Sequence, residues 1–499
     1  MFFSIFIPLS LISIGLLAYY MLCKQESPLT TKVMKVVCVV WMSLYFLKIF
    51  LPDGFVLRSF DDIEIYKSGK GIPFAIFRWI REASFVILPI AIFLKKPLFS
   101  KFAAYGVVAI SLLNIGLYSV QIAHFTDPNG QGIMTLRFFS AETKAFFVNR
   151  TFRAIVFGVI SYLELMLAVS VALRDRKVLT INKDIKSVLK NVGIFFIIVL
   201  ALIPIFVPQY LTKGYSMTTD KNIDNFKMGT FFHFVWIAMV IVEGVVLSLV
   251  FRKKSYQDRY ILVLILGFAL LLQYNTMFTC VGEITAHRMP FQLCNMAGFF
   301  IIAMLIKRSE KIYHFTLVIN SVGALIAMVL CDTTPYGVSY VMNAHYILEH
   351  TNVILVPLLC ATLGIFKPLK TRDIKDFVLG FTAYFLFVLL IGGIFTAIKD
   401  KYATIDPNVS SYWNCNYLYM FNKEESTSII GFVGPLFDAN FKLFNFFTLS
   451  LVQPVIYAVF LAICSGAFFL LKFLFRKNTL WEQTNEHTIV SEWAKLNSN

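Results

Sequence analysis

Long apolar stretches separated by short polar connections repeat along the whole chain. A helix needs about 20 apolar residues to cross the hydrocarbon core of a bilayer, so each stretch predicts a membrane-spanning helix. We expect thirteen spans, at residues 2–23, 36–50, 74–94, 102–123, 154–173, 192–207, 231–251, 260–279, 289–306, 315–331, 345–366, 377–398 and 444–475. The pattern therefore predicts an all-α fold, a polytopic transmembrane helical bundle.

The connections between the predicted spans alternate in charge. Lys and Arg gather in every second connection, for example at residues 95–101, 174–190 and 307–311, and again in the C-terminal tail. By the positive-inside rule these connections face the cytoplasm. We therefore expect a multi-pass protein of the cell membrane, with its N-terminus outside and its C-terminus in the cytoplasm.

The composition agrees with a bilayer as the main solvent. The 499 residues are 58% hydrophobic and 15% charged, with a mean hydropathy of +0.72, which is too apolar for soluble domains. The net charge of +16 lies in the connections, so we interpret it as a topology signal and expect no nucleic-acid partner. The eight cysteines show neither CxxC nor Cys/His zinc spacing, so we expect no disulfide framework, no metal and no cofactor.

The order of spans also predicts the domain organisation. We expect an N-terminal six-helix half at residues 1–230, a seven-helix half at 231–475 and a cytoplasmic tail at 476–499. The two halves show a similar order of spans, which leaves a duplicated six-helix unit open. The oligomeric state stays open as well.

Basic residues lie inside two spans of the N-terminal half. Arg78 and Arg81 are close to Glu82 in the third span, and Arg150 and Arg153 lie at the start of the fifth. Ionisable residues are costly inside a membrane and often mark a functional site. We expect these arginines to bind an anionic headgroup in the outer leaflet. The alternative is that they pair with Glu82 or extend to the membrane interface.

A cysteine and a histidine lie near the outer ends of the ninth and eleventh predicted spans. Cys294 and His350 each follow the expected span start by five residues, which places both at a depth of about 7.5 Å. Pro290 favours a helix start there, and the dipole of a helix N-terminus favours a thiolate. These are the properties of a nucleophile and its base. The alternative is that Cys294 is only a small packing residue.

Four short motifs surround these two residues: HRMPFQLC at 287–294, CDTTPYG at 331–337, AHYILEH at 344–350 and NCNYLYM at 414–420. With them, residues 231–475 resemble the YwaF-like integral membrane family. That family is similar to the TMEM-type transmembrane acyltransferases and more distantly to the androgen-induced lipid hydrolases. The resemblance implies that Cys294 is the nucleophile and His350 the base. Gln292 departs from the pattern, because bacterial members often have histidine there.

The leading hypothesis is a cysteine-dependent acyltransferase or lipid hydrolase that acts on acyl esters at the outer leaflet. His345, Gln292, Asn275 and Tyr417 would support the catalytic pair, the last three as donors to an oxyanion. The expected partners are membrane lipids, including a phospholipid acyl donor. The alternatives are a transporter or flippase for lipids or glycan phosphates, and a non-catalytic membrane partner.

Overall fold

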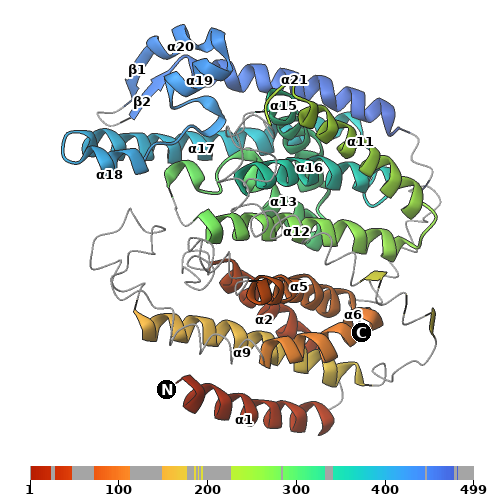
Figure 1. Cartoon of the computed structure of the whole chain (residues 1–499). Helices are drawn as coiled ribbons and strands as arrows, with labels where there is room; N and C mark the ends of the chain where they lie inside the picture. The colour runs from red at the N-terminus through yellow and green to blue at the C-terminus, as the bar shows by residue number, and fades with distance from the viewer. Residues whose placement is uncertain are drawn as a thin grey trace. The chain divides into compact units, whose positions relative to one another are not determined.

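The computed structural model describes residues 2–23, 28–47, 72–112, 149–176, 185–186, 189, 193–194, 226–281, 285–331, 341–443, 447–476 and 480 (Figure 1). The chain divides into two compact units, unit 1 with Met1–Thr218, Asn275–Gly282 and His487–Asn499, and unit 2 with Thr219–Tyr274 and Glu283–Glu486. The described residues are mainly helical. The predicted domain boundary at residue 231 stays a prediction, and the predicted span 192–207 lies almost wholly outside the described residues.

Unit 1 is built of helices. They are α1 (Phe2–Cys23), α2 (Pro28–Leu47), α5 (Ile72–Leu94), α6 (Pro97–Lys101), the π-helix η2 (Phe102–Val107) and α9 (Arg150–Arg174). Helix α9 packs against α1, α2 and η2, and α5 packs against α2. The side chains of Trp41, Tyr45 and Phe85 form a buried aromatic contact between α2 and α5.

Two buried carboxylates of unit 1 accept hydrogen bonds from hydroxyl groups on neighbouring segments. Tyr45 of α2 donates to Glu82 of α5. Ser111 donates to Glu164 of α9 at 2.9 Å. Buried polar groups without a partner are costly, so these bonds are what permits the two acids inside an apolar bundle.

Unit 2 begins with five main helical segments, the second of which ends in residues, from Asn275 on, that are counted with unit 1. The five segments are α11 (Phe231–Phe251), α12 (Tyr256–Val281), α13 (Leu293–Lys307), the nearly continuous run of α14 (Glu310–Phe315), η6 (Thr316–Asn320) and α15 (Ser321–Leu330), and α16 (Val341–Thr362). Short 3₁₀ turns, η5 (Ala286–Arg288) and η7 (Thr371–Asp373), precede α13 and α17 (Ile374–Ala403). The rest comprises α18 (Pro407–Tyr412), η8 (Tyr417–Tyr419), α19 (Lys423–Ile429), η9 (Gly431–Val433), α20 (Gly434–Asp438), β1 (Asn440–Leu443), β2 (Phe447–Ser450) and α21 (Val452–Leu474).

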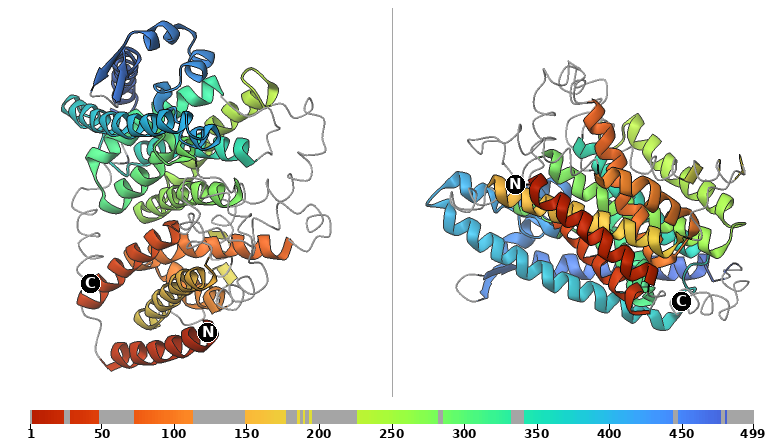
Figure 2. Two further views of the ribbon diagram at one scale, coloured as in Figure 1. Left: turned by 90° about the vertical axis from the view of Figure 1, so that its left-hand side faces the viewer. Right: turned by 90° about the horizontal axis from the view of Figure 1, so that it is seen from below.

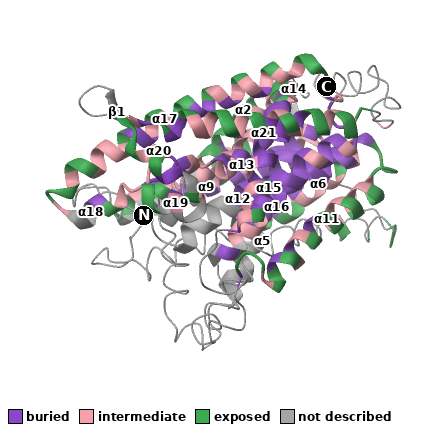
Figure 3. Cartoon of the chain, turned by 90° about the horizontal axis from the view of Figure 1, so that it is seen from above, coloured by how far each residue is buried: buried purple, intermediate pink, exposed green. Residues whose placement is uncertain are grey.

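Helix α16 lies at the centre of unit 2. It packs against α11, α13 and α15, whereas α17 packs against α14 and α21. Figure 3 shows the buried residues gathered on α13, α15 and α16, with exposed residues along α11. Helix α12 approaches α13 closely at Gly267, where a Cβ atom would lie 3.2 Å from Ile301. The polar site described below lies where α13 meets α16.

The outer helices of unit 2 present apolar surfaces. Few side chains of α11 and α21 are buried although both helices are strongly apolar, and contiguous surfaces of this kind are covered by lipid or another protein. Six helical segments among the described residues are long and apolar enough to cross a membrane: 29–46, 155–174, 231–251, 310–330, 371–403 and 452–474. This supports the predicted all-α membrane protein, while the thirteen spans and their orientation stay predictions.

Several predicted boundaries agree with the helices. The spans 2–23 and 231–251 coincide with α1 and α11. The last predicted span, 444–475, starts too early, because Phe447–Ser450 form strand β2, which pairs antiparallel with β1, Asn440 opposite Ser450. The hairpin lies beside α20 (Figures 1 and 2), and α21 begins only at Val452.

Candidate functional site

Cys294 lies in the first turn of α13. Met289, which precedes Pro290, has the extended conformation that a following proline favours, with φ −60° and ψ 149°. Gln292 is also extended, with φ −62° and ψ 147°, and caps the helix that begins at Leu293. The predicted helix start at residue 289 is therefore wrong, because the segment around Pro290 is a turn that precedes the helix.

The helix N-terminus supplies hydrogen-bond donors to the cysteine. The first N–H groups of a helix have no acceptor within the helix itself. At α13 the backbone N–H groups of Cys294 and Asn295 are directed at the Sγ atom of Cys294. These donors and the helix dipole favour negative charge on the sulfur, whereas burial, the largest effect, and the carboxylate of Glu349 oppose it.

A polar chain connects Cys294 with α16. The thiol interacts with the carboxylate of Glu349. With its amide nitrogen turned toward that carboxylate, Asn295 donates to Glu349 Oε1 at 2.6 Å and Oε2 at 3.1 Å, and the same amide group lies 3.6 Å from Cys294 Sγ. One helical turn away, His345 Nε2 lies 3.3 Å from Glu349 Oε2. The carboxylate thus collects donors from both helices inside unit 2.

His350 is buried beside this chain. Its ring packs on Tyr346 with centroids 4.2 Å apart, and its Nδ1 lies 2.6 Å from the Tyr346 carbonyl oxygen. Because a carbonyl oxygen only accepts, Nδ1 carries the proton, and Nε2 of a neutral ring then carries the lone pair. His350 also interacts electrostatically with Glu349 and His345. The geometry orients His350 as a proton acceptor through Nε2.

Three other elements hold the segment that leads into α13. Asn320 of η6 donates to the Leu293 carbonyl at 2.9 Å, and Tyr384 of α17 donates to the Phe291 carbonyl at 2.8 Å. Tyr417 of η8 donates to the Ala286 carbonyl. These buried bonds fix residues 286–293 and with them the position of Cys294.

The predicted supporting residues divide into three groups. His345 belongs to the polar chain. Gln292 Nε2 donates to the Asn416 carbonyl at 3.4 Å, and the Tyr417 hydroxyl donates to the Ala286 carbonyl. Both donors are therefore used by backbone groups of the protein and not directed at an oxyanion. The side chain of Asn275 lies outside the described residues. Four residues were predicted to bind a lipid headgroup: Arg78, Arg81, Arg150 and Arg153. Their backbones lie on α5 and α9, and their side chains lie outside the described part of the structure.

Cys294 and His350 were expected at one depth from predicted helix starts that differ from the observed ones. Cys294 follows Leu293 directly, whereas His350 lies nine residues after the first residue of α16, Val341. The two helices nevertheless pack together. The residue next to His350, Glu349, reaches the thiol of Cys294.

Asn295, Glu349 and Tyr384 belong to the site but were not predicted from the sequence. Glu349 carried a usable signal, since it is an ionisable residue inside a predicted span and is spaced i, i+4 from His345. Tyr384 also interacts electrostatically with Cys294 and Tyr417. Asn295 and Tyr384 have no comparable signal, because amides and tyrosines occur throughout the chain.

Comparison with known proteins supports the prediction that the C-terminal half of the chain is a transmembrane part of the protein. Residues 226–464, just under half of the chain, match the model of the TMEM164 family, a transmembrane family. The match contains Cys294, Asn295, Glu349 and His350. Searches of curated proteins and of solved structures give no match. Similarity to the TMEM group is thereby supported, while the likeness to YwaF-like proteins and acyltransferases stays a prediction.

Proposed function

We propose that this protein transfers or hydrolyses the acyl groups of membrane lipids through a thioester on Cys294. One observation carries the proposal: Cys294 lies at the N-terminus of α13, among N–H donors, and contacts Glu349 of α16. A thiol in such surroundings has a nearby proton acceptor in Glu349, and the N–H groups of the helix N-terminus can donate to the sulfur once its proton has left. Buried apolar helices on either side suit a lipid substrate.

In the first half of the reaction, Cys294 Sγ attacks the carbonyl carbon of an acyl ester. The S–H proton passes to the carboxylate of Glu349, with which the thiol interacts. When the tetrahedral intermediate collapses, the carbon–oxygen bond of the ester breaks and the leaving alcohol takes that proton. The product is an acyl thioester on Cys294.

In the second half, a hydroxyl group of an acceptor lipid or of water attacks the thioester. His350 Nε2 accepts the hydroxyl proton. This nitrogen has a free lone pair because Nδ1 carries the proton that is donated to the Tyr346 carbonyl. The carbon–sulfur bond breaks, and the proton returns from His350 to the sulfur. A base positioned in this way contributes about 10²- to 10⁴-fold to the rate. Glu349 thus serves acylation and His350 serves deacylation.

The proposal is tested on the full-length protein in vesicles that contain a phospholipid with an alkyne-tagged acyl chain. We expect label on the wild-type protein that neutral hydroxylamine removes, since it cleaves thioesters and spares oxygen esters. Cys294→Ala abolishes the label. His350→Ala retains it and slows turnover about 100-fold or more, whereas Glu349→Gln slows its formation.

The matched control is Cys360→Ala, which changes a fully buried cysteine of α16 in the same unit. We expect this variant to be labelled as the wild type is. Hydroxylamine-sensitive label that persists in Cys294→Ala would refute the proposal. Label that is lost equally in both cysteine variants would also count against it, because a general disturbance of unit 2 would then explain the loss.

A further inference from the structure

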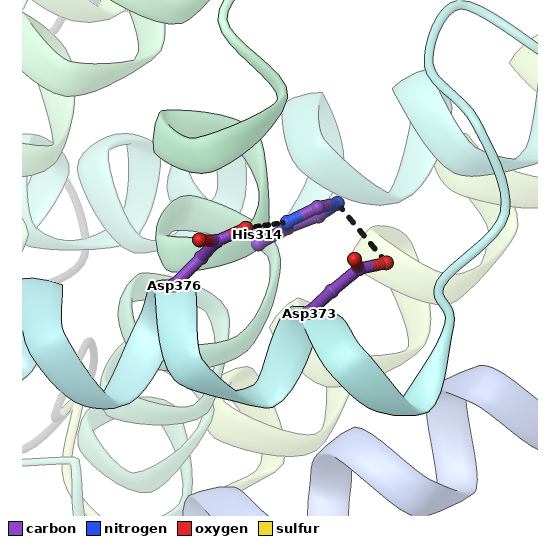
Figure 4. Close-up of side chains that lie close together, drawn as sticks. All are labelled: His314, Asp373 and Asp376. Carbon is purple, nitrogen blue, oxygen red and sulfur yellow. Dashed lines mark hydrogen bonds and ion pairs between the residues drawn. The ribbon is translucent and has the colours of Figure 1, made fainter.

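A second polar cluster lies in unit 2, formed by His314 of α14, Asp373 of η7 and Asp376 of α17 (Figure 4). One ligand atom from each residue lies within 4.8 Å of the other two. The cluster is largely buried, with 4% of the His314 side chain exposed, 14% of Asp373 and 12% of Asp376. The predicted topology puts these residues on the cytoplasmic side, away from the outer leaflet expected for Cys294.

The two carboxylates contact opposite nitrogens of the imidazole ring, as Figure 4 shows. His314 Nδ1 lies 2.9 Å from Asp376 Oδ2, an ordinary hydrogen-bond distance. His314 Nε2 lies 3.7 Å from Asp373 Oδ2, which is too long for a hydrogen bond. A ring that donates through Nδ1 presents a lone pair at Nε2, and this lone pair faces a carboxylate oxygen across the gap.

The gap between Nε2 and Asp373 has the width of a metal-bridged pair. Zn²⁺ binds imidazole nitrogen and carboxylate oxygen at about 2.1 Å. With two such bonds, a separation of 3.7 Å corresponds to an angle of about 124° at the ion, near that of a tetrahedral site. A hydrogen-bonded carboxylate on the other ring nitrogen, here Asp376, is the usual support of a metal-binding histidine.

Asp373 is itself held in place. Its Oδ2 accepts a hydrogen bond from the backbone N–H of Lys370 at 2.7 Å, part of a capping box at the start of η7. Arg372 Nε lies 3.8 Å from the other oxygen, on a side chain that is 77% exposed. The second lone pair of Oδ2 is therefore available to a cation, and the carboxylate needs no new conformation to bind one.

We propose that His314 Nε2 and Asp373 Oδ2 bind a divalent transition-metal ion, with Asp376 as the group that orients the imidazole. An imidazole ligand favours Zn²⁺, Co²⁺ or Ni²⁺ over Mg²⁺ and Ca²⁺. Two protein ligands leave the remaining coordination positions to water or an exchangeable anion. The site is independent of the proposed acyl chemistry, and it differs from the expectation of no metal that was drawn from the cysteine pattern.

The test uses the purified full-length protein, freed of metal with a chelator and titrated with Co²⁺. We expect one Co²⁺ per chain, with visible absorption typical of nitrogen and oxygen ligands, and a rise in the thermal unfolding midpoint. His314→Gln and Asp373→Asn weaken binding at least tenfold. Asp376→Asn weakens it by about 10- to 100-fold, as loss of a supporting carboxylate does elsewhere.

The control is His287→Gln, which changes an exposed histidine of the same unit and should leave Co²⁺ binding unchanged. Each variant is compared with the wild type for its metal-free unfolding midpoint, so that loss of the fold is distinguished from loss of a ligand. Wild-type protein that binds no Co²⁺, or binding that is equally strong in His314→Gln and Asp373→Asn, would overturn the proposal. The cluster would then be an ion pair between α14 and α17.

Discussion

His345 and Glu349 lie one turn apart on α16, with Nε2 and Oε2 separated by 3.3 Å, and the same carboxylate accepts two hydrogen bonds from the Asn295 amide of α13. Glu349 is 4% exposed, so its negative charge depends on these donors. The pair therefore stabilises the packing of α13 on α16 and also holds the Glu349 carboxylate beside Cys294.

Glu349→Ala removes the acceptor shared by His345 and Asn295. We expect the free energy of unfolding to fall by about 1–3 kcal/mol, since buried donors lose their partner. Unfolding of the detergent-solubilised protein measures this. The control is Glu310→Gln, because Glu310 pairs with Lys367 at 3.7 Å with both side chains about 40% exposed, and it should cost less than about 1 kcal/mol. Equal losses in the two variants would contradict the role given to Glu349.

Tyr384→Phe removes the hydroxyl that donates to the Phe291 carbonyl at 2.8 Å. We expect a loss of about 1 kcal/mol in unfolding free energy and slower acylation of Cys294, because the turn before α13 is less restrained. The control on the neighbouring helix is Tyr457→Phe, which removes a hydroxyl contact of 2.7 Å with Thr382. If both variants slow acylation alike, Tyr384 has no specific influence on Cys294.

Hydropathy predicted the helices that have an uninterrupted apolar sequence, as α11 shows with its observed bounds Phe231–Phe251. It also predicted helices at the positions of α13 and α16, which the structure packs together. It failed at residues 447–451, where strand β2 is followed after one residue by the apolar helix α21 with no charged residue between them. Composition alone does not show where such a run changes from strand to helix.

The site was predicted less completely than the helices. Cys294 and the histidines were identified by residue type, but the contact of Cys294 with Glu349 depends on how α13 and α16 are rotated about their axes. The His314 cluster has the same origin, because Asp373 and Asp376 come from a segment some 60 residues further along the chain. Side-chain contacts between distant helices are set by packing angles, which periodicity leaves open.

Tyr417 provides a test at alkaline pH. Burial raises the pKa of its phenol above the ordinary value of 10.0. The folded protein keeps this proton where the unfolded chain has lost it, so the stabilisation is complete below about pH 10 and is lost as the pH rises through the raised pKa. We expect the unfolding free energy to fall above about pH 10, by at most about 1.4 kcal/mol per pH unit from this group. Tyr417→Phe should reduce that slope; an unchanged slope would contradict the assignment.

Gly380 lets α17 approach α14 closely. A Cβ atom at this position would lie 2.8 Å from Phe315 Cδ2 and 3.4 Å from its Cγ, and Phe315 is 5% exposed, so its ring has little room to move. We expect Gly380→Ala to lower the unfolding free energy by about 1–3 kcal/mol through overpacking. Phe315→Leu in the same chain should restore part of this loss, because a smaller side chain opens the space that the methyl group needs.

The matched control for this effect is Gly466→Ala in α21, where a Cβ atom would have no neighbour within 4 Å. Alanine is favoured over glycine inside a helix by up to about 1 kcal/mol, so this variant should be neutral or more stable. If Gly380→Ala lowers the unfolding free energy while Gly466→Ala raises it, the loss at residue 380 is due to the contact with Phe315. If both variants lose stability, or if Phe315→Leu fails to compensate, the close approach of α14 and α17 does not depend on Gly380.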